Sequence, residues 1–261
     1  MKKYAIFSDI DGTLVSFRTH RIPESTVNAL TEAKANGHRF YISTGRPTEI
    51  IKNLQQIENL IDGYITTNGA YCFVGSKEVC TNAISDEDFN TVLHDSDEQH
   101  YPIIVVGEKD VIIYNYTDQV DRIFRRDLGV DNLDYSKPAD VLKGQRILQL
   151  TPFITAEQEA VLMPRLSHCV SGRWHPEFTD ITSDEADKGK GLVAIAQHEG
   201  IDIEDTIALG DGGNDIPILR KAGIGVAMGN AGDDVKACAD MTTGHIDEDG
   251  FEQALRKLGV I

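Results

Sequence analysis

Two aspartates after the first apolar run constrain this chain more than any other feature. The run is Tyr-Ala-Ile-Phe at residues 4–7, and Asp9 and Asp11 follow it, just before Gly12. Residues i and i+2 of an extended strand point to the same side, so both carboxylates would face one small volume beyond the strand's carboxyl end. Open α/β sheets bind ligands there, and Gly12 lets the chain turn sharply away. An ordinary solvated Asp-Gly turn is the alternative for this segment taken alone.

A second group of acids and glycines follows an apolar run near the other end of the chain. Residues 206–209, Thr-Ile-Ala-Leu, predict a buried strand. Gly-Asp-Gly-Gly-Asn-Asp follows at residues 210–215, and a helical stretch is expected over 216–222. The carboxyl end of a second strand therefore also carries acids in a Gly-rich turn.

Two further segments add hydroxyl groups and bases. The apolar run that begins at Phe40 ends in Ser43, Thr44, Gly45 and Arg46, and Lys188 opens a helix with the sequence Lys-Gly-Lys-Gly-Leu. Together the four segments supply acids, hydroxyls, bases and Gly-rich turns at strand ends or helix starts. Such a set indicates one shared site rather than four separate turns.

On these residues the chain resembles haloacid dehalogenase-like phosphatases of the Cof type. That family's motifs are Asp-x-Asp-Gly-Thr, a strand ending in Thr-Gly-Arg, a Lys-Gly-x-x-Leu helix start and Gly-Asp-Gly-x-Asn-Asp. All four occur here in the family's order, between Asp9 and Asp215, and Thr-Asn-Gly-Ala at 67–70 matches a further Asn-Gly-Ala signature. Gly213 stands where glutamate is common, and Ser43 stands where alanine is common. Neither departure removes a ligand, and the resemblance covers essentially the whole chain.

Strands and helices alternate at both ends of the chain, which predicts an α/β fold with a doubly wound, Rossmann-like parallel sheet. Helices are expected over 23–36, 47–59, 188–200, 234–239 and 249–258, and a further strand over 224–228. Pro23 near a first turn and Gly37 and Gly200 as stops support two of these helices. The helix over 47–59 rests on the apolar residues 50, 51, 54 and 57 at helical spacing.

The middle of the chain has a different, mixed α/β pattern. It predicts a helix capped by Ser85, a hairpin of 103–106 with 111–115, a helix over 117–128, a strand over 146–150, a helix capped by Thr155 and Gln158, and short strands near His168 and Phe178. This block separates the second motif from the third, so we predict core segments 1–81 and 182–261 around an inserted domain, 82–181. In the family that the chain resembles, an α/β cap over the active site occupies this position.

Composition and charge limit the partners. The chain has 261 residues, 41% of them hydrophobic and 26% charged, which suits one large or two modest globular domains. Its net charge of −17 argues against nucleic acid and against an anionic membrane surface. A small phosphorylated metabolite remains compatible with it if a cation and a few bases make the site locally positive. The oligomeric state is left open.

Cysteine usage and hydropathy bear on location. The four cysteines, Cys72, Cys80, Cys169 and Cys238, show no Cys-x-x-Cys spacing, so we expect reduced thiols rather than a zinc site or a disulfide framework. Only a short apolar run follows Met1, and no stretch approaches 18 apolar residues. These features predict a cytoplasmic protein.

The resemblance implies roles for the acids. Asp9 would be the nucleophile that forms an aspartyl-phosphate, and Asp11 would protonate the leaving alcohol and later deprotonate water. Because carboxylates repel a phosphate dianion, a divalent cation is required, and oxygen-only ligands suit Mg²⁺. Its ligands would be the Asp9 carboxylate, the Asp11 backbone carbonyl and Asp211. Asp215 would lie behind them, supporting the ligands rather than binding the ion.

The remaining motif residues would hold the substrate. Lys188 and the Thr44 hydroxyl would bind the phosphoryl oxygens, with help from Asn214 and from backbone N–H groups of turns such as that at Gly45. Arg46 either contacts the substrate or pairs with a neighbouring acid. Each of these residues taken alone is also compatible with an ordinary surface or capping role.

The resemblance implies a Mg²⁺-dependent phosphohydrolase of small phosphomonoesters. Because members of that family commonly act on sugar phosphates, hexose phosphates are the favoured substrates. A phosphomutase of the same superfamily and a non-catalytic phosphate- or metal-binding module are the alternatives. Cap residues would select the substrate. Arg173, beside Trp174, is one candidate, and a surface arginine packed on the tryptophan is its equally plausible alternative.

Overall fold

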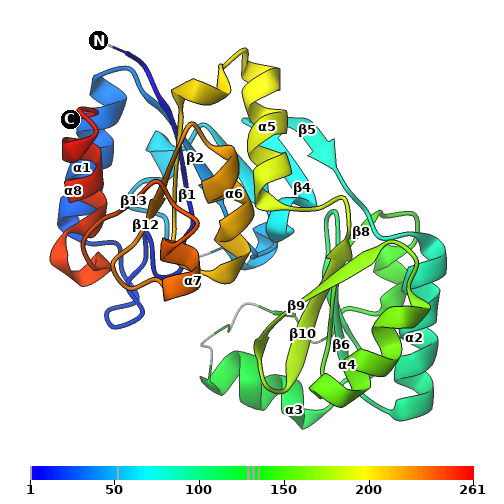
Figure 1. The fold of residues 1–261 in the computed structure, drawn as a ribbon. Helices are drawn as coiled ribbons and strands as arrows, with labels where there is room; N and C mark the ends of the chain where they lie inside the picture. Colours follow the sequence, from blue (N-terminus) through cyan, green and yellow to red (C-terminus); the bar gives the residue numbers. More distant parts are fainter. Residues whose placement is uncertain (1, 52, 128–129, 131–132, 135) are drawn as a thin grey trace. The chain divides into compact units, whose positions relative to one another are not determined.

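The computed structural model describes residues 2–51, 53–127, 130, 133, 134 and 136–261, and its contacts divide the chain into two compact units (Figure 1). The first unit comprises Met1–Arg46, Ile51–Thr81 and Asp187–Ile261. The second comprises Pro47–Ile50 and Asn82–Ala186. The acids, hydroxyl and bases assigned to the predicted site all belong to the first unit.

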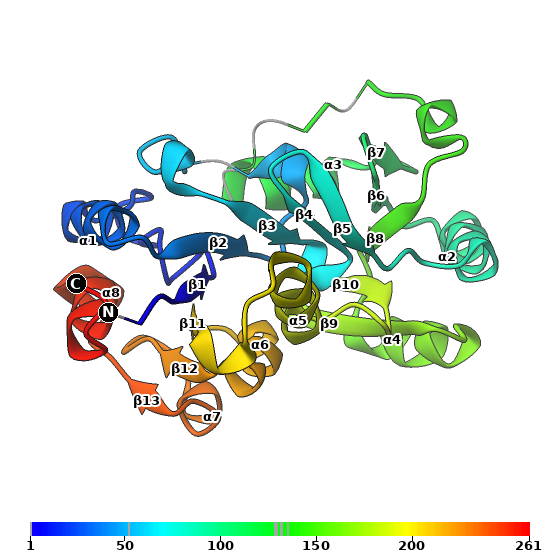
Figure 2. The same ribbon diagram turned by 90° about the horizontal axis from the view of Figure 1, so that it is seen from above.

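Within the described residues, the first unit holds an eight-stranded sheet in the order β13-β12-β11-β1-β2-β3-β4-β5 (Figure 2). The strands are β1 Ala5–Ser8, β2 Arg39–Ser43, β3 Gly63–Thr66, β4 Tyr71–Val74, β5 Lys77–Thr81, β11 Thr206–Gly210, β12 Ile224–Ala227 and β13 Met241–Thr242. β1 pairs in parallel with both β2 and β11, whereas β4 and β5 run antiparallel to their neighbours. The carboxyl ends of β1, β2 and β11 therefore meet at one edge of the sheet.

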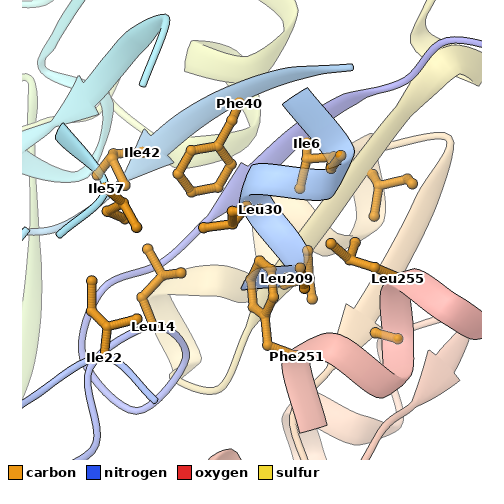
Figure 3. Packing of buried hydrophobic residues seen from close by; sticks show 14 of the residues in the cluster. Ile6, Leu14, Ile22, Leu30, Phe40, Ile42, Ile57, Leu209, Phe251 and Leu255 are labelled. Carbon is orange, nitrogen blue, oxygen red and sulfur yellow. The ribbon is translucent and has the colours of Figure 1, made fainter. Parts of the chain in front are cut away.

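Helices cover both faces of this sheet. They are α1 Glu24–Ala35, α5 Lys188–Glu199, α6 Ile216–Lys221, α7 Asp233–Lys236 and α8 Gly250–Lys257. In β1, Ile6 packs in a cluster with Leu30 of α1 and Phe251 of α8 (Figure 3), whereas Phe7 packs with Leu192 of α5. Successive strand residues thus bury side chains on opposite faces, which explains the uninterrupted apolar run. The prediction of a doubly wound parallel α/β core is confirmed.

The predicted helix over 47–59 is wrong. The structure has only single 3-10 turns, at Thr48–Ile50 and Glu58–Leu60, and Lys52 lies outside the described residues. Asn53 has a φ of +65°, a left-handed conformation that a right-handed helix cannot contain. Leu54 and Ile57 are buried in the core, so their apolar spacing reflects burial of an irregular segment rather than a helical face.

Other helix predictions hold. α1 begins after Pro23, and Gly37, with a φ of +83°, follows its end. α5 ends at Gly200, which has a φ of +65° and lets two helical carbonyls accept its N–H group. Among the described residues, no helix combines the length and the apolar character needed to cross a bilayer.

The second unit holds, in its described part, a five-stranded antiparallel sheet in the order β7-β6-β8-β10-β9. Its strands are β6 Ile103–Gly107, β7 Val111–Tyr114, β8 Ile147–Pro152, β9 Cys169–His175 and β10 Phe178–Ser183, and its helices are α2 Asp86–Gln99, α3 Asp118–Val120 and α4 Ala156–Leu162. A wider π-type turn, Asp121–Asp127, continues α3, and Leu128 of the predicted helix lies outside the described residues. Ser85 caps α2, and Thr155 forms a capping box with Gln158 on α4, as their spacing predicts.

Candidate active site

A buried lysine joins two of the predicted site acids. Nζ of Lys188, the first residue of α5, lies 2.7 Å from Oδ1 of Asp9 and 2.6 Å from Oδ1 of Asp215. The lysine side chain has no exposed surface. An ammonium group at a helix N-terminus is electrostatically unfavourable, and its burial adds a desolvation cost. The carboxylates of Asp9 and Asp215 offset both the unfavourable helix dipole and the desolvation cost, so a charged Lys188 can be buried here only together with these two acids.

Asp215 shapes the Gly-rich turn that follows β11. Its Oδ2 accepts hydrogen bonds from the backbone N–H groups of Asp211, at 3.0 Å, and Gly212, at 2.9 Å. Its Oδ1 faces Lys188. Both carboxylate oxygens are therefore engaged within the protein, which suits a supporting residue better than a metal ligand.

Asp211 is held by two neutral donors. The Thr13 hydroxyl donates to its Oδ1 at 2.8 Å, and Nδ2 of Asn230 donates to its Oδ2 at 3.2 Å and to the Gly12 carbonyl at 2.8 Å. Gly12 has a φ of +82°, and a Cβ there would lie 2.2 Å from Oδ2 of Asp211. Thr13 lies in the Asp-x-Asp-Gly-Thr motif but was not predicted to take a role in the site, and Asn230 was not predicted at all. The signal for Asn230 was a polar residue closely following an apolar strand, at Met-Gly-Asn-Ala, 228–231.

Three acids bring carboxylate oxygens close together, and two of them, Asp9 and Asp211, are the predicted metal ligands. Among the described residues, one carboxylate oxygen each from Asp9, Asp211 and Asp215 lies within 4.8 Å of the others. The donors are all oxygens, which is the set that Mg²⁺ prefers. These residues fit a divalent cation of that kind.

Burial and neighbouring charges shift the pKa values of the clustered acids and of Lys188. Burial raises the pKa of Asp9 well above its usual range, and the nearby carboxylates of Asp215, Asp11 and Asp211 add to the rise, against the opposing Lys188. Burial likewise raises the pKa of Asp211 to about 6. Burial alone would lower the pKa of Lys188, but Asp215 and Asp9 outweigh it and hold that pKa above its ordinary value. Besides burial, the neighbouring carboxylates thus disfavour the charged form of Asp9, an effect that a bound cation would oppose.

Asp11 has a different partner from Asp9. Nε and an Nη of Arg46 donate to its two carboxylate oxygens, both at 2.7 Å, in a bidentate pair. The structure shows the pairing of Arg46 with an acid, and contact between Arg46 and the substrate stays a prediction. Asp9 joins the three-acid cluster, whereas the Asp11 carboxylate is directed to the arginine at the end of β2.

Predicted phosphate-binding residues follow two strands of the sheet, Thr44 and Gly45 after β2 and Asn214 after β11. Thr44 is buried, and its hydroxyl accepts a hydrogen bond from the Arg46 N–H at 3.1 Å. Nδ2 of Asn214 donates to Oδ1 of Asn68 at 3.0 Å, and a Cβ on Gly45 would lie 3.0 Å from the same Oδ1. The turn after β3 thus adds Asn68, which the sequence analysis had placed only within a family signature.

Arg173, the candidate specificity residue in the second unit, donates its hydrogen bonds to neighbouring groups within that unit. Its Nε donates to Oε2 of Glu159 at 2.6 Å. Its other nitrogens donate to the backbone carbonyls of Ile154, His175, Pro176 and Phe178. Arg173 therefore joins α4 to the turn between β9 and β10, and the side chain of Trp174 lies outside the described part of the chain.

A parallel α/β core whose strand ends gather acids around a buried lysine defines a hydrolase of the haloacid dehalogenase-like class. The model of that family matches residues 6–255, and the chain belongs to it. A solved structure titled as a haloacid dehalogenase subclass IIB sugar phosphatase has a TM-score of 0.90 and 45% identity, covering 99% of this chain and 100% of that one.

Two proteins of Bacillus subtilis are also similar. YkrA, a phosphatase by name, is 31% identical, with 100% of both chains covered. YitU, named as a 5-amino-6-(5-phospho-D-ribitylamino)uracil phosphatase, is 29% identical, covering 98% of this chain and 97% of its own length. With the family match, these similarities confirm that the chain is a phosphatase of the Cof type.

Proposed function

We propose that this phosphatase hydrolyses phosphomonoesters of small polyhydroxylated molecules, hexose phosphates in particular, with Mg²⁺ and through an aspartyl-phosphate on Asp9. The buried Lys188 between Asp9 and Asp215, beside Asp211, is the observation that carries the proposal. The substrate class is supported by the sugar phosphatase at 45% identity and by YitU, whose named substrate carries its phosphate on a ribityl chain.

In the first half-reaction, a carboxylate oxygen of Asp9 bonds to phosphorus while the bond to the ester oxygen breaks. Asp11, protonated on one carboxyl oxygen, gives that proton to the departing ester oxygen, while its other oxygen keeps a hydrogen bond from Arg46. In the second half-reaction, Asp11 takes a proton from water, the water oxygen bonds to phosphorus, and the bond to Asp9 breaks. Free phosphate and the unmodified Asp9 carboxylate result.

The phosphoryl oxygens would be held by the Lys188 ammonium, the Thr44 hydroxyl, the Asn214 amide and the backbone N–H of Gly45. We assign the Asp9 and Asp211 carboxylates and the Asp11 carbonyl as ligands of Mg²⁺. When bound, that ion supplies positive charge that offsets the repulsion between carboxylates and the phosphate dianion. Positioning and charge stabilisation of this kind carry most of phosphoryl transfer.

We further propose that residues 82–181 form a cap that selects the leaving group, inserted between core segments 1–81 and 182–261. The enzyme would act in the cytoplasm on a small phosphorylated metabolite, with neither nucleic acid nor membrane as a partner. The four cysteines, all free thiols in the structure, accord with a reducing compartment.

The test is phosphate release from a panel of phosphomonoesters, comparing the wild type with Asp9→Asn and Asp11→Asn. Asp9→Asn should abolish turnover and phosphoenzyme formation. Asp11→Asn should retain phosphate binding and lose roughly 10²–10⁴-fold in kcat on alkyl phosphates, with a smaller loss on an aryl phosphate, whose leaving group needs little protonation. Chelator should remove activity, Mg²⁺ should restore it, and Ca²⁺ should support it poorly because its coordination is larger and looser.

Product analysis separates the alternatives. An isomerised sugar phosphate in place of free phosphate would indicate a phosphomutase, and no turnover of any ester would indicate a binding module. Full activity in metal-free buffer, or a larger Asp11→Asn defect on aryl than on alkyl phosphate, would contradict the assigned roles.

A further inference from the structure

Three consecutive residues after β3 have left-handed backbone conformations. The φ angles are +47° at Thr67, +53° at Asn68 and +94° at Gly69. Glycine adopts this region freely and asparagine tolerates it, but a β-branched threonine there is a genuine outlier. Such a conformation persists only where its surroundings hold it, and it occurs preferentially at functional sites.

The surroundings of this turn are the proposed active-site segments. Its first two N–H groups donate to the backbone carbonyls of Arg46, at 3.1 Å, and Thr44, at 3.0 Å. At its third residue, a Cβ on Gly69 would lie 2.2 Å from the carbonyl oxygen of Asp187, which directly precedes Lys188. The turn is therefore fixed against the end of β2 and the start of α5.

The turn presents one side chain to the site. Oδ1 of Asn68 accepts the hydrogen bond from Nδ2 of Asn214, and both ends of its carboxamide lie close to Gly45. Asn214 is itself exposed in its turn after β11. An exposed carboxamide samples several rotamers, and its apparent affinity for a ligand falls with the fraction in the binding orientation. The hydrogen bond to Asn68 raises that fraction.

We propose that Asn68 is a positioning residue of this phosphatase: it orients the Asn214 carboxamide toward the phosphoryl group, and the strained turn exists to place it there. The inference rests on the proposed phosphate-binding role of Asn214. Because it acts on binding rather than on bond making, its removal should affect KM and the affinity for inorganic phosphate, with little change in kcat.

Asn68→Gly tests the proposal, because glycine accepts a φ of +53° without cost and only the carboxamide is lost. Asn53→Gly, the same change at an exposed asparagine with a φ of +65°, is the matched control and should behave as wild type. For Asn68→Gly we expect KM for an aryl phosphate and Ki for inorganic phosphate to rise about three- to tenfold, while kcat stays within about twofold. Asn68→Ala loses the same carboxamide but adds backbone strain at this φ, so an equal rise in Ki in both variants would assign the effect to the carboxamide rather than to a change in stability.

A double-mutant cycle separates positioning from a general structural role. If Asn68 acts through Asn214, Asn68→Gly combined with Asn214→Ala should match Asn214→Ala alone. Two results would overturn this inference and leave the proposed function intact. One is a rise in Ki in the double variant equal to the product of the two single rises, and the other is an unchanged Ki in Asn68→Gly beside a raised Ki in Asn214→Ala. An unchanged Ki in Asn214→Ala would instead refute the proposed role of Asn214, and the inference with it.

Discussion

The Asp211 carboxylate should destabilise the metal-free protein at neutral pH. Its burial raises the pKa from 3.8 to about 6, and a difference of about two units corresponds to about 3 kcal/mol. A carboxyl group with a raised pKa in the folded state binds its proton more tightly there than in the unfolded chain. Its contribution to stability is therefore most favourable below pH 3.8, declines as the pH rises from 3.8 to about 6, and is constant above that range.

Asp211→Asn should consequently stabilise the protein in chelator at pH 7. The amide oxygen can still accept the hydrogen bond from Thr13, but the new NH₂ group would face Nδ2 of Asn230, which costs about 1 kcal/mol. The net gain is then about 2 kcal/mol at pH 7, falls to zero between about pH 4 and pH 5, and becomes a loss of about 1 kcal/mol below pH 3.8, where only the unfavourable contact with Asn230 remains. Mg²⁺ should reverse the order, because it stabilises the wild type by binding and the variant lacks a proposed ligand.

The assay is thermal unfolding at several pH values between 4 and 7, with chelator or with Mg²⁺. Hydrogen exchange of the β1 and β11 amides, measured under the same conditions, reports on the stability of the first unit. A gain of about 2 kcal/mol should raise the midpoint by about 4–8 °C. Asp202→Asn, at an exposed acid, is the control and should change neither the unfolding midpoint nor its dependence on pH. A variant less stable than wild type in chelator at pH 7, or a difference that does not depend on pH, would refute the reasoning.

Two further predictions follow from single contacts. Arg46→Met should lower kcat on alkyl phosphates roughly tenfold, and much less on an aryl phosphate, because Asp11 loses its bidentate partner; an equal loss on both esters, measured by phosphate release, would argue against it. In the second unit, Asp88→Ala should cost about 2 kcal/mol or more, because buried Asp88 accepts hydrogen bonds from the N–H groups of Ser167 and His168. Despite the opposing effect of burial, these bonds lower the pKa of Asp88, so the loss, measured by urea unfolding, should shrink as the pH falls below 3.8.

The parallel core was predictable because its strands are short apolar runs with chemistry at their carboxyl ends. β1, β2 and β11 each end directly before a motif, and adjacent parallel strands bring those ends together. The segment 47–59 was not predictable in the same way. Apolar residues at helical spacing report only that Leu54 and Ile57 are buried, and the left-handed Asn53 leaves no mark in the hydrophobic pattern.

The site was predictable in its residue types and less so in its contacts. Thr13 and Asn68 were noted only as members of motifs, and Asn230 was missed, because each contacts another site residue through one or two hydrogen bonds that depend on which strand ends are neighbours. The pairing of Arg46 with Asp11 likewise depends on where the Asp11 side chain points, which the motif alone does not specify. A motif specifies the groups that chemistry needs, but the loops that hold them are set by three-dimensional packing.

The charges of the site explain why its parts occur together. Four acids, Asp9, Asp11, Asp211 and Asp215, surround two bases, Lys188 and Arg46. Lys188 is shared by two of the acids and Arg46 is paired with the third, while Asp211 is held by neutral donors. The formal excess is that of two carboxylates, which one divalent cation would neutralise. A phosphate dianion brings the same charge again, so in the proposed mechanism its binding needs the cation together with neutral donors. Asn214 is one of these proposed donors, and its carboxamide donates to Oδ1 of Asn68.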